Sequence, residues 1–159
     1  MSSHLTTDQV WKEVKKEIFC VLGMVTANQE SRTVGVVYLV QDRQLLIGTG
    51  KDTWKARHIR DNPSVSITIP IAKRIPLLPW IKIPAATITF SGTARVLSGE
   101  ESCPELLSAG FRHKADGEEF LSNSCLIEIH PQGDFLTYGI GVPLMHMRQP
   151  ELARGRVSV

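Results

Sequence analysis

The stretch GTGKDTWKARHIRDNPSVSITI (48–69) decides how the rest of the chain is read. Its order indicates a strand end, a glycine-threonine turn, a short basic helix, a proline stop and a second strand. We predict the helix over roughly Thr53 to Asp61, with Asp52 or Thr53 as its N-cap. Proline disfavours helix in the residue before it, so Asn62-Pro63 ends this helix.

The first helical turn has the chemistry of a phosphate site. It combines the Thr53 hydroxyl, the Lys55 cation and backbone N–H groups that have no partner inside the helix, a combination that favours a phosphate. Arg57, Arg60 and Lys51 can add to the positive field. The plain alternative is a helix cap followed by a solvated helix face.

The segments on either side of this stretch alternate as strands do. Three apolar or β-branched runs joined by short polar turns precede it and indicate an antiparallel meander; they cover residues 19–27, 33–40 and 45–49. An amphipathic helix over 6–18 comes before them, with Thr6 and Gln9 at capping-box spacing.

The second half of the chain is also rich in strands. Residues 64–71 alternate cleanly and read as a half-buried strand, and 85–98 read as a long strand with a bulge or bend at Gly92. We further expect a helix over 100–111, a turn or helical turn at 116–121 and a last hairpin of 125–129 with 134–140. Residues 72–84 carry three prolines, which a central strand cannot accommodate, and therefore form a loop.

These elements predict a mainly β (α+β) fold. We expect a six- to seven-stranded antiparallel split β-barrel with flanking helices, because closure removes the edges of such a sheet. The 159 residues fit one domain over 1–159. A formal net charge of +2 gives no general argument for nucleic acid.

The predicted localisation rests on the N-terminal residues, the length of the apolar runs and the cysteines. The polar start MSSHLTTDQ lacks a signal core, and no apolar run reaches the ~20 residues of a membrane helix. Cys20, Cys103 and Cys125 show no pattern and read as reduced thiols. We therefore expect a cytoplasmic protein without a membrane partner. The histidines have no metal spacing, so no metal site is predicted.

The order of elements in 48–69 resembles the pyridoxamine 5'-phosphate oxidase-like FMN-binding split barrels. The resemblance is carried by the Thr-x-Lys-Ala helix start, the Asn-Pro stop and the following strand, namely Thr53, Lys55, Ala56, Ile59, Asn62, Pro63, Val65 and Ser66. More loosely it extends from about residue 17 to 140. It implies a homodimer with FMN at the interface between the two barrels.

The resemblance also implies which residues touch the cofactor. Thr53 and Lys55 would hold the FMN phosphate, and the strand end Ile47, Gly48 and Thr49 would lie along the isoalloxazine ring. Arg57 would add positive charge near the phosphate. Trp54 either stacks on the cofactor or packs within the protein.

The chain departs from the enzyme that names the family at several positions. Trp54 stands where that enzyme has an arginine, and Gly35 and Val40 stand near the places of its second-strand Arg and Lys. Its C-terminal arginine motif has no convincing match, although Arg154 and Arg156 lie near the end of the chain. A phosphorylated vitamin is therefore not the expected substrate.

The functional expectation is an FMN-binding oxidoreductase that transfers a hydride or electrons to or from a small substrate. Residues 71–84, with Trp80, are expected to line the substrate site, although a dimer contact or a lid is an alternative for this loop and is favoured over membrane contact. Two other readings stay open: a deazaflavin-dependent reductase, and a non-catalytic flavin or haem carrier or sensor. The sequence identifies no catalytic residue.

Overall fold

The computed structural model describes residues 5–102, 105, 107, 109 and 118–159. Its strands form one antiparallel sheet in the order β2-β1-β5-β6-β7-β4-β3, with β8 paired to β7. The strands are β1 (Phe19–Val25), β2 (Ser31–Val37), β3 (Leu39–Gln41), β4 (Gln44–Gly50), β5 (Ser64–Ile71), β6 (Ala86–Ser98), β7 (Ser124–Tyr138) and β8 (Arg154–Ser158). The helices are α1 (Thr7–Lys16), α2 (Trp54–Asp61), α4 (Glu118–Asn123) and α5 (Pro150–Ala153), with a 3-10 turn η1 (Leu144–Arg148).

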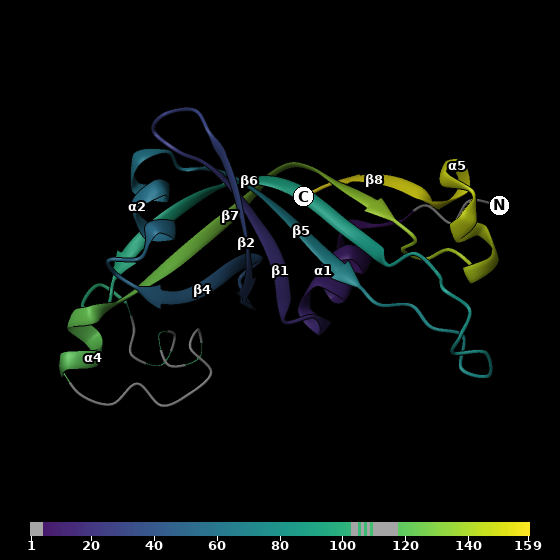
Figure 1. The fold of residues 1–159 in the computed structure, drawn as a ribbon, viewed down its shortest axis with the longest axis horizontal. Coiled ribbons are helices and arrows are strands. Elements are labelled where there is room, and N and C mark those ends of the chain that lie inside the picture. Colours follow the sequence, from purple (N-terminus) through teal and green to yellow (C-terminus); the bar gives the residue numbers. More distant parts are fainter. Residues whose placement is uncertain (1–4, 103–104, 106, 108, 110–117) are drawn as a thin grey trace.

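The sheet curls into a half-barrel, which confirms the predicted split barrel with flanking helices (Figure 1). The two ends of the molecule differ. Helices α2 and α4 lie at one end of the elongated sheet, and α5, η1 and the β5–β6 loop lie at the other (Figure 1). The antiparallel pairs expected at the start of the chain are present, since β1 pairs with β2 and β3 with β4. The two pairs lie at opposite edges of the sheet, so they do not form one three-stranded meander.

The core lies inside the curl of the sheet. Alternating residues of β5 and β6 are buried there, as their sequence pattern predicts. Phe135 joins two parts of the core, since its ring packs edge-on against Trp11 at 5.4 Å and against Phe90 at 5.2 Å. Through Trp11, helix α1 covers the inner face of the sheet.

Helix α1 begins as predicted from the capping-box spacing. The Gln9 amide donates to the Thr6 hydroxyl at 3.3 Å, and the Thr6 amide donates to the Gln9 carbonyl oxygen at 2.8 Å. Each bond satisfies an amide that the helix leaves without a partner. Val10, Trp11 and Val14 form its buried face.

The predicted hairpin over 125–129 and 134–140 is wrong, because both segments belong to the single strand β7. His130-Pro131-Gln132-Gly133 reads as a turn, but β6 runs alongside and supplies partners on both sides of it. The chain accommodates the extra length in a bulge, in which Gly133 has φ +77° and Gly133–Phe135 lie opposite Phe90. A proline is tolerated at a bulge.

Gly92 is not the bulged residue, because it stays in register with Pro131. Its role is close approach: a Cβ atom at Gly92 would lie 2.7 Å from the carbonyl oxygen of His130. The run predicted as one strand over 33–40 divides at Tyr38, whose buried hydroxyl donates to the Val14 carbonyl at 2.7 Å. That bond ties β2 and β3 to α1.

Other differences concern the second half of the chain. The segment after Ile140, which shows no period in the sequence, forms η1, α5 and the edge strand β8. In the segment expected as a turn or helical turn at 116–121, the described residues 118–121 belong to α4. The helix predicted over 100–111 falls largely outside the described residues.

Cys20 and Cys125 are buried free thiols, as predicted. Among the described helices, none is long and apolar enough to cross a bilayer.

Candidate functional site

The start of α2 is anchored by a threonine pair. The Thr53 hydroxyl donates to the Gly50 carbonyl at 2.9 Å and accepts from the Ala56 amide at 3.4 Å, so Thr53 is the N-cap. With its proton committed to Gly50, it can only accept from Thr49, whose hydroxyl lies 3.3 Å away. Thr49 is itself buried in β4. The strand end and the helix start are thereby held together.

Two backbone N–H groups at this helix start have no protein acceptor. The amide of Ala56 is capped by Thr53, and that of Arg57 donates to the Thr53 carbonyl at 3.1 Å. The amides of Trp54 and Lys55 make no hydrogen bond to another described residue. Helix α2 also has no acidic residue in its first turn. Paired, outward amides of this kind are suited to an anion.

The strand before α2 offers further backbone groups. β4 pairs with β7 from Leu45 to Gly50, but with β3 only from Gln44 to Leu46. Within the described part of the chain, Ile47–Gly50 therefore have no strand partner on the β3 side. Ile47 itself is buried in the core, so only its backbone is free to contact a ligand.

Cations surround this end of the molecule. Arg57 is exposed and Lys55 half-exposed, and the Arg60 guanidinium donates to the Lys51 carbonyl at 3.0 Å. Burial raises the pKa of the Cys125 thiol, the positive charges of Arg60 and Lys55 act to lower that pKa, and the negative charge of Asp52 acts to raise it. Cys125 is the register partner of Thr49. The field of these cations thus reaches the strand end beside α2.

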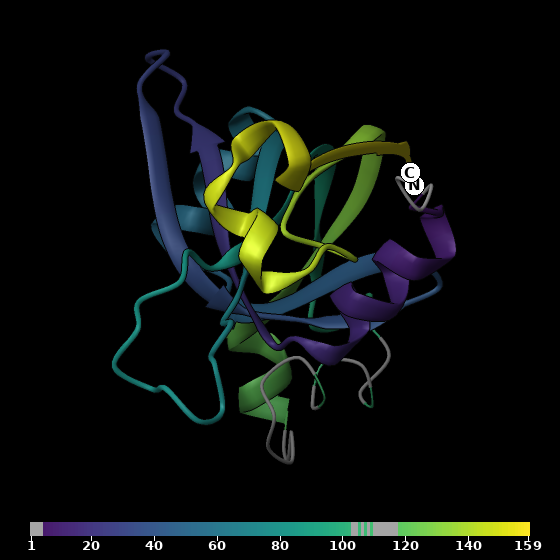
Figure 2. The same ribbon diagram turned by 90° about the vertical axis from the view of Figure 1, so that its right-hand side faces the viewer.

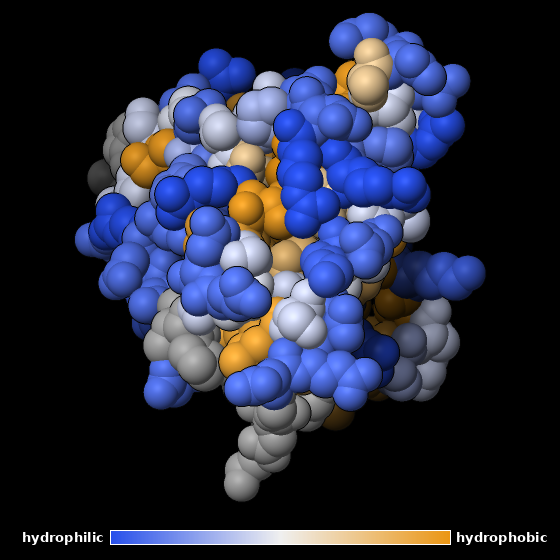
Figure 3. Space-filling view, turned by 90° about the vertical axis from the view of Figure 1, so that its left-hand side faces the viewer, coloured by the Kyte–Doolittle hydropathy of each residue, from blue (hydrophilic) through white to orange (hydrophobic). Residues whose placement is uncertain are grey.

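Trp54 lies on the surface beside Lys55. Its ring is 38% exposed and contacts the His58 ring edge-on at 5.7 Å, and the Lys55 ammonium lies 5.9 Å from its centroid. The face at this end is mostly hydrophilic, with small hydrophobic areas near its centre (Figure 3). A planar, apolar group that carries a phosphate would find both kinds of contact here.

The structure brings together all but one of the predicted site residues. Thr49, Thr53, Trp54, Lys55 and Arg57 lie at one end of the sheet with the free edge of β4. The loop that carries Trp80 leaves the opposite end of the sheet (Figure 1). In one chain the structure therefore does not bring Trp80 together with α2.

A cavity beside α2 joins two of the cations noted in the sequence. It has a volume of about 220 Å³, and Lys51, Arg60 and serines of neighbouring segments line it. The serines are Ser98, Ser122 and Ser124. In the described residues no group of three or more His, Cys, Asp or Glu side chains could hold a metal ion.

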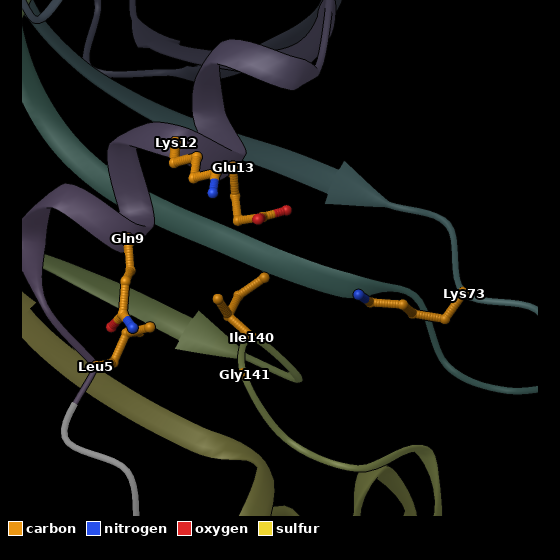
Figure 4. Close-up of a pocket in the computed structure, with 7 residues that line it drawn as sticks. All are labelled: Leu5, Gln9, Lys12, Glu13, Lys73, Ile140 and Gly141. Carbon is orange, nitrogen blue, oxygen red and sulfur yellow. The ribbon is translucent and has the colours of Figure 1, made fainter.

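Sequence reasoning missed two adjoining cavities at the far end of the molecule. One, of about 290 Å³, lies between α1 and the start of the β5–β6 loop, with Lys12, Glu13 and Lys73 around Ile140 (Figure 4). The other, of about 550 Å³, is lined by the C-terminal segment, including His146, Arg154 and Arg156. Their walls come from segments far apart in the sequence, so only the two arginines gave a signal there.

The comparisons with known proteins address the family and the fold. The sequence profile described as "Pyridoxamine 5'-phosphate oxidase" matches residues 6–133, most of the chain. A comparison with curated protein sequences finds no match.

Several solved structures share the fold at low sequence identity. A heme binding protein from Mycobacterium smegmatis is 14% identical, with a TM-score of 0.62 over 94% of this chain but 56% of its own length. An FAD binding protein from Mycobacterium smegmatis is 15% identical, with a TM-score of 0.55 over 80% of this chain and 90% of its own. An F420 reductase is 14% identical, with a TM-score of 0.52 over 74% of this chain and 88% of its own.

Proposed function

The chain belongs to the pyridoxamine 5'-phosphate oxidase family, and we propose that it binds FMN at the start of α2. The observation that carries the proposal is the pair of amides of Trp54 and Lys55, which have no acceptor among the described residues, in a first helical turn without acidic residues. A phosphate near −2 charge is stabilised at a helix N-terminus by about 0.3–2 kcal/mol. Charge-assisted hydrogen bonds add about 1.5–3 kcal/mol each.

The residues present fit such a group, with one change from the sequence-based expectation. The Thr53 hydroxyl already donates to Gly50, so its part is to fix the helix start and to hold Thr49 in place. Lys55 and the two amides remain for the phosphate, and the free edge of Ile47–Gly50 remains for the ring. Arg57 contributes charge from the exposed face.

The proposed activity is an oxidoreductase. A bound flavin supplies the hydride or electron transfer, and the protein's part is to hold and orient it. The chain offers two contacts for a ring beside the polar helix start, namely the indole of Trp54 and the unpaired backbone edge at Gly48. The catalytic residues and the substrate are not assigned.

We also propose that the active form is a homodimer. Three apolar side chains stay about half exposed where β1 begins and β2 ends: Ile18, Phe19 and Val37. Their cluster is apolar surface that a second copy of the chain would cover. A molar mass near twice 17.7 kDa in light scattering would support the dimer, and one near 17.7 kDa would count against it.

A deazaflavin is the alternative cofactor, and one observation is consistent with it. A Cβ atom at Gly35 would lie 2.7 Å from ring atoms of Phe19, so the Phe19 ring covers the place of a second-strand side chain. A cation that the family enzyme directs at FMN from there is therefore missing. A non-catalytic flavin or haem carrier is the remaining reading.

The test is a titration of the purified chain with FMN, riboflavin, deazaflavin and hemin. Riboflavin is the matched control, because it has the ring of FMN and lacks the phosphate. We expect FMN to bind at least about tenfold more tightly than riboflavin, as one charge-assisted bond requires. Equal affinities would refute the phosphate site, and a preference for deazaflavin or hemin would replace FMN as the cofactor.

A further inference from the structure

The loop between β5 and β6 (residues 72–85) has no part in the cofactor site. Seven apolar residues, IPLLPWI, occupy positions 75–81 between Arg74 and Lys82. Two successive turns shape this tip: the Leu78 amide donates to the Ile75 carbonyl at 3.2 Å, and the Ile81 amide donates to the Leu78 carbonyl at 3.1 Å. Pro76 and Pro79 fix the backbone further. The tip is thus a shaped element with outward side chains.

Its apolar side chains face solvent. Leu77 is 87% exposed and Trp80 72% exposed, and both exceed Trp54 at 38%. The loop stands clear of the body of the molecule in two perpendicular views (Figure 2). Apolar side chains left exposed in this way mark a site of contact with another apolar surface, such as that of a protein, a ligand or a membrane.

Cations flank the tip, and acids are absent from a wide range around it. The sequence from Asn62 to Gly99 contains no Asp or Glu. Arg74 and Lys82 are exposed, and among the described residues neither takes part in an ion pair. Lys73 turns back toward the groove that it shares with Lys12 of α1 (Figure 4). The surface around the loop base is therefore positive.

We propose that this loop docks the protein on an anionic phospholipid surface. Leu77 and Trp80 insert at the level of the headgroups, where an indole is favoured, and Arg74 and Lys82 contact the lipid phosphates. The arrangement is that of a protein that lies on a bilayer without spanning it. For Trp80 this is a different role from the substrate contact predicted from the sequence, and the proposal departs from the sequence-based expectation of no membrane partner.

Charge favours a lipid surface over a contact between two copies of this loop. Two such loops placed against each other would bring Arg74 and Lys82 of both copies together. The groove at the loop base is lined by Lys12, Lys73 and Glu13, so it keeps a net positive charge on the same side. An anionic surface complements these cations.

The test is co-sedimentation of the full chain with vesicles of phosphatidylcholine alone or with about one third phosphatidylserine. We expect binding to the anionic vesicles only, weakened by salt. Leu77→Asp/Trp80→Asp and Arg74→Glu/Lys82→Glu should each reduce it by about tenfold or more. The matched controls, Met145→Asp (79% exposed) and Lys15→Glu/Arg32→Glu, should bind like the native chain.

Three results would overturn the proposal. One is no binding to anionic vesicles, and another is equal loss in the loop variants and their controls. The third is a change from dimer to monomer in the loop variants by light scattering, which would assign the loop to a second copy. FMN affinity, measured on the same samples, reports separately on the cofactor proposal.

Discussion

Each end of the molecule carries a tryptophan near cations, but one tryptophan lies in a helix and the other in a loop. At one end Trp54 lies beside Lys55 and Arg57 in α2; at the other Trp80 lies between Arg74 and Lys82 in the β5–β6 loop. In α2 the apolar Ala56 and Ile59 are three residues apart, and both are buried. In the loop the prolines prevent a helix, so no spacing can gather the apolar side chains on one buried face.

The difference shows that local backbone structure determines what a similar composition can do. Helix α2 buries its apolar face and presents amides and cations, which suits an anionic ligand of defined shape. The loop presents its apolar side chains themselves, which suits a broad apolar surface. Four measurements test this contrast between α2 and the β5–β6 loop.

The largest expected effect is on stability. Replacing Ile59 by Ala removes a buried side chain that packs in the core and should lower the free energy of unfolding by about 2–5 kcal/mol. Replacing Leu77 by Ala should change it by no more than about 0.5 kcal/mol, because the side chain is exposed. Urea denaturation of both variants measures the difference. Similar losses would mean that the loop packs on the protein.

The next effect concerns the cofactor. Lys55→Ala should weaken FMN binding by about 10- to 100-fold and leave riboflavin binding nearly unchanged, since the lost contact is to the phosphate. Lys82→Ala is the control at the opposite end and should not change either affinity. Fluorescence titration gives both values. An equal loss for FMN and riboflavin would place Lys55 at the ring or in the fold instead.

The third effect separates capping from ligand binding at Thr53. Thr53→Ala should destabilise the protein by about 1 kcal/mol, because the Ala56 amide loses its acceptor and Thr49 loses its partner. Thr53→Ser keeps the hydroxyl and should retain most of that stability. Thermal unfolding of the two variants without ligand is the measurement. Equal stability of the alanine and serine variants would show that the cap contributes nothing.

Alternating apolar residues and the residues that break helices or strands were enough to predict the elements around α2. Strand β5 has the predicted bounds because Pro63 ends the preceding segment and apolar residues alternate to Ile71. Thr53 was named as one of two candidate caps. In β7, Pro131 and Gly133 also suggest that a strand ends, and that prediction is wrong. The strand continues because its long partner β6 turns the local break into a bulge.

Strand β8 and the far cavities could not be predicted for a related reason. The sequence RGRVS is short and half-exposed, and its pairing with β7 depends on the length of that strand. For the site, the order of elements was enough to group Thr49 with Thr53. The separation of Trp80 from α2 depends on the extent of the sheet in space, which no local pattern encodes.

The most direct test of the central claim is an amide chemical-shift titration of the native chain with FMN. We expect the largest shifts at the amides of Trp54 and Lys55, with the amides of Leu77 and Trp80 unchanged. Largest shifts at the loop or along the C-terminal segment, with Trp54 and Lys55 unmoved, would contradict a phosphate site at the start of α2.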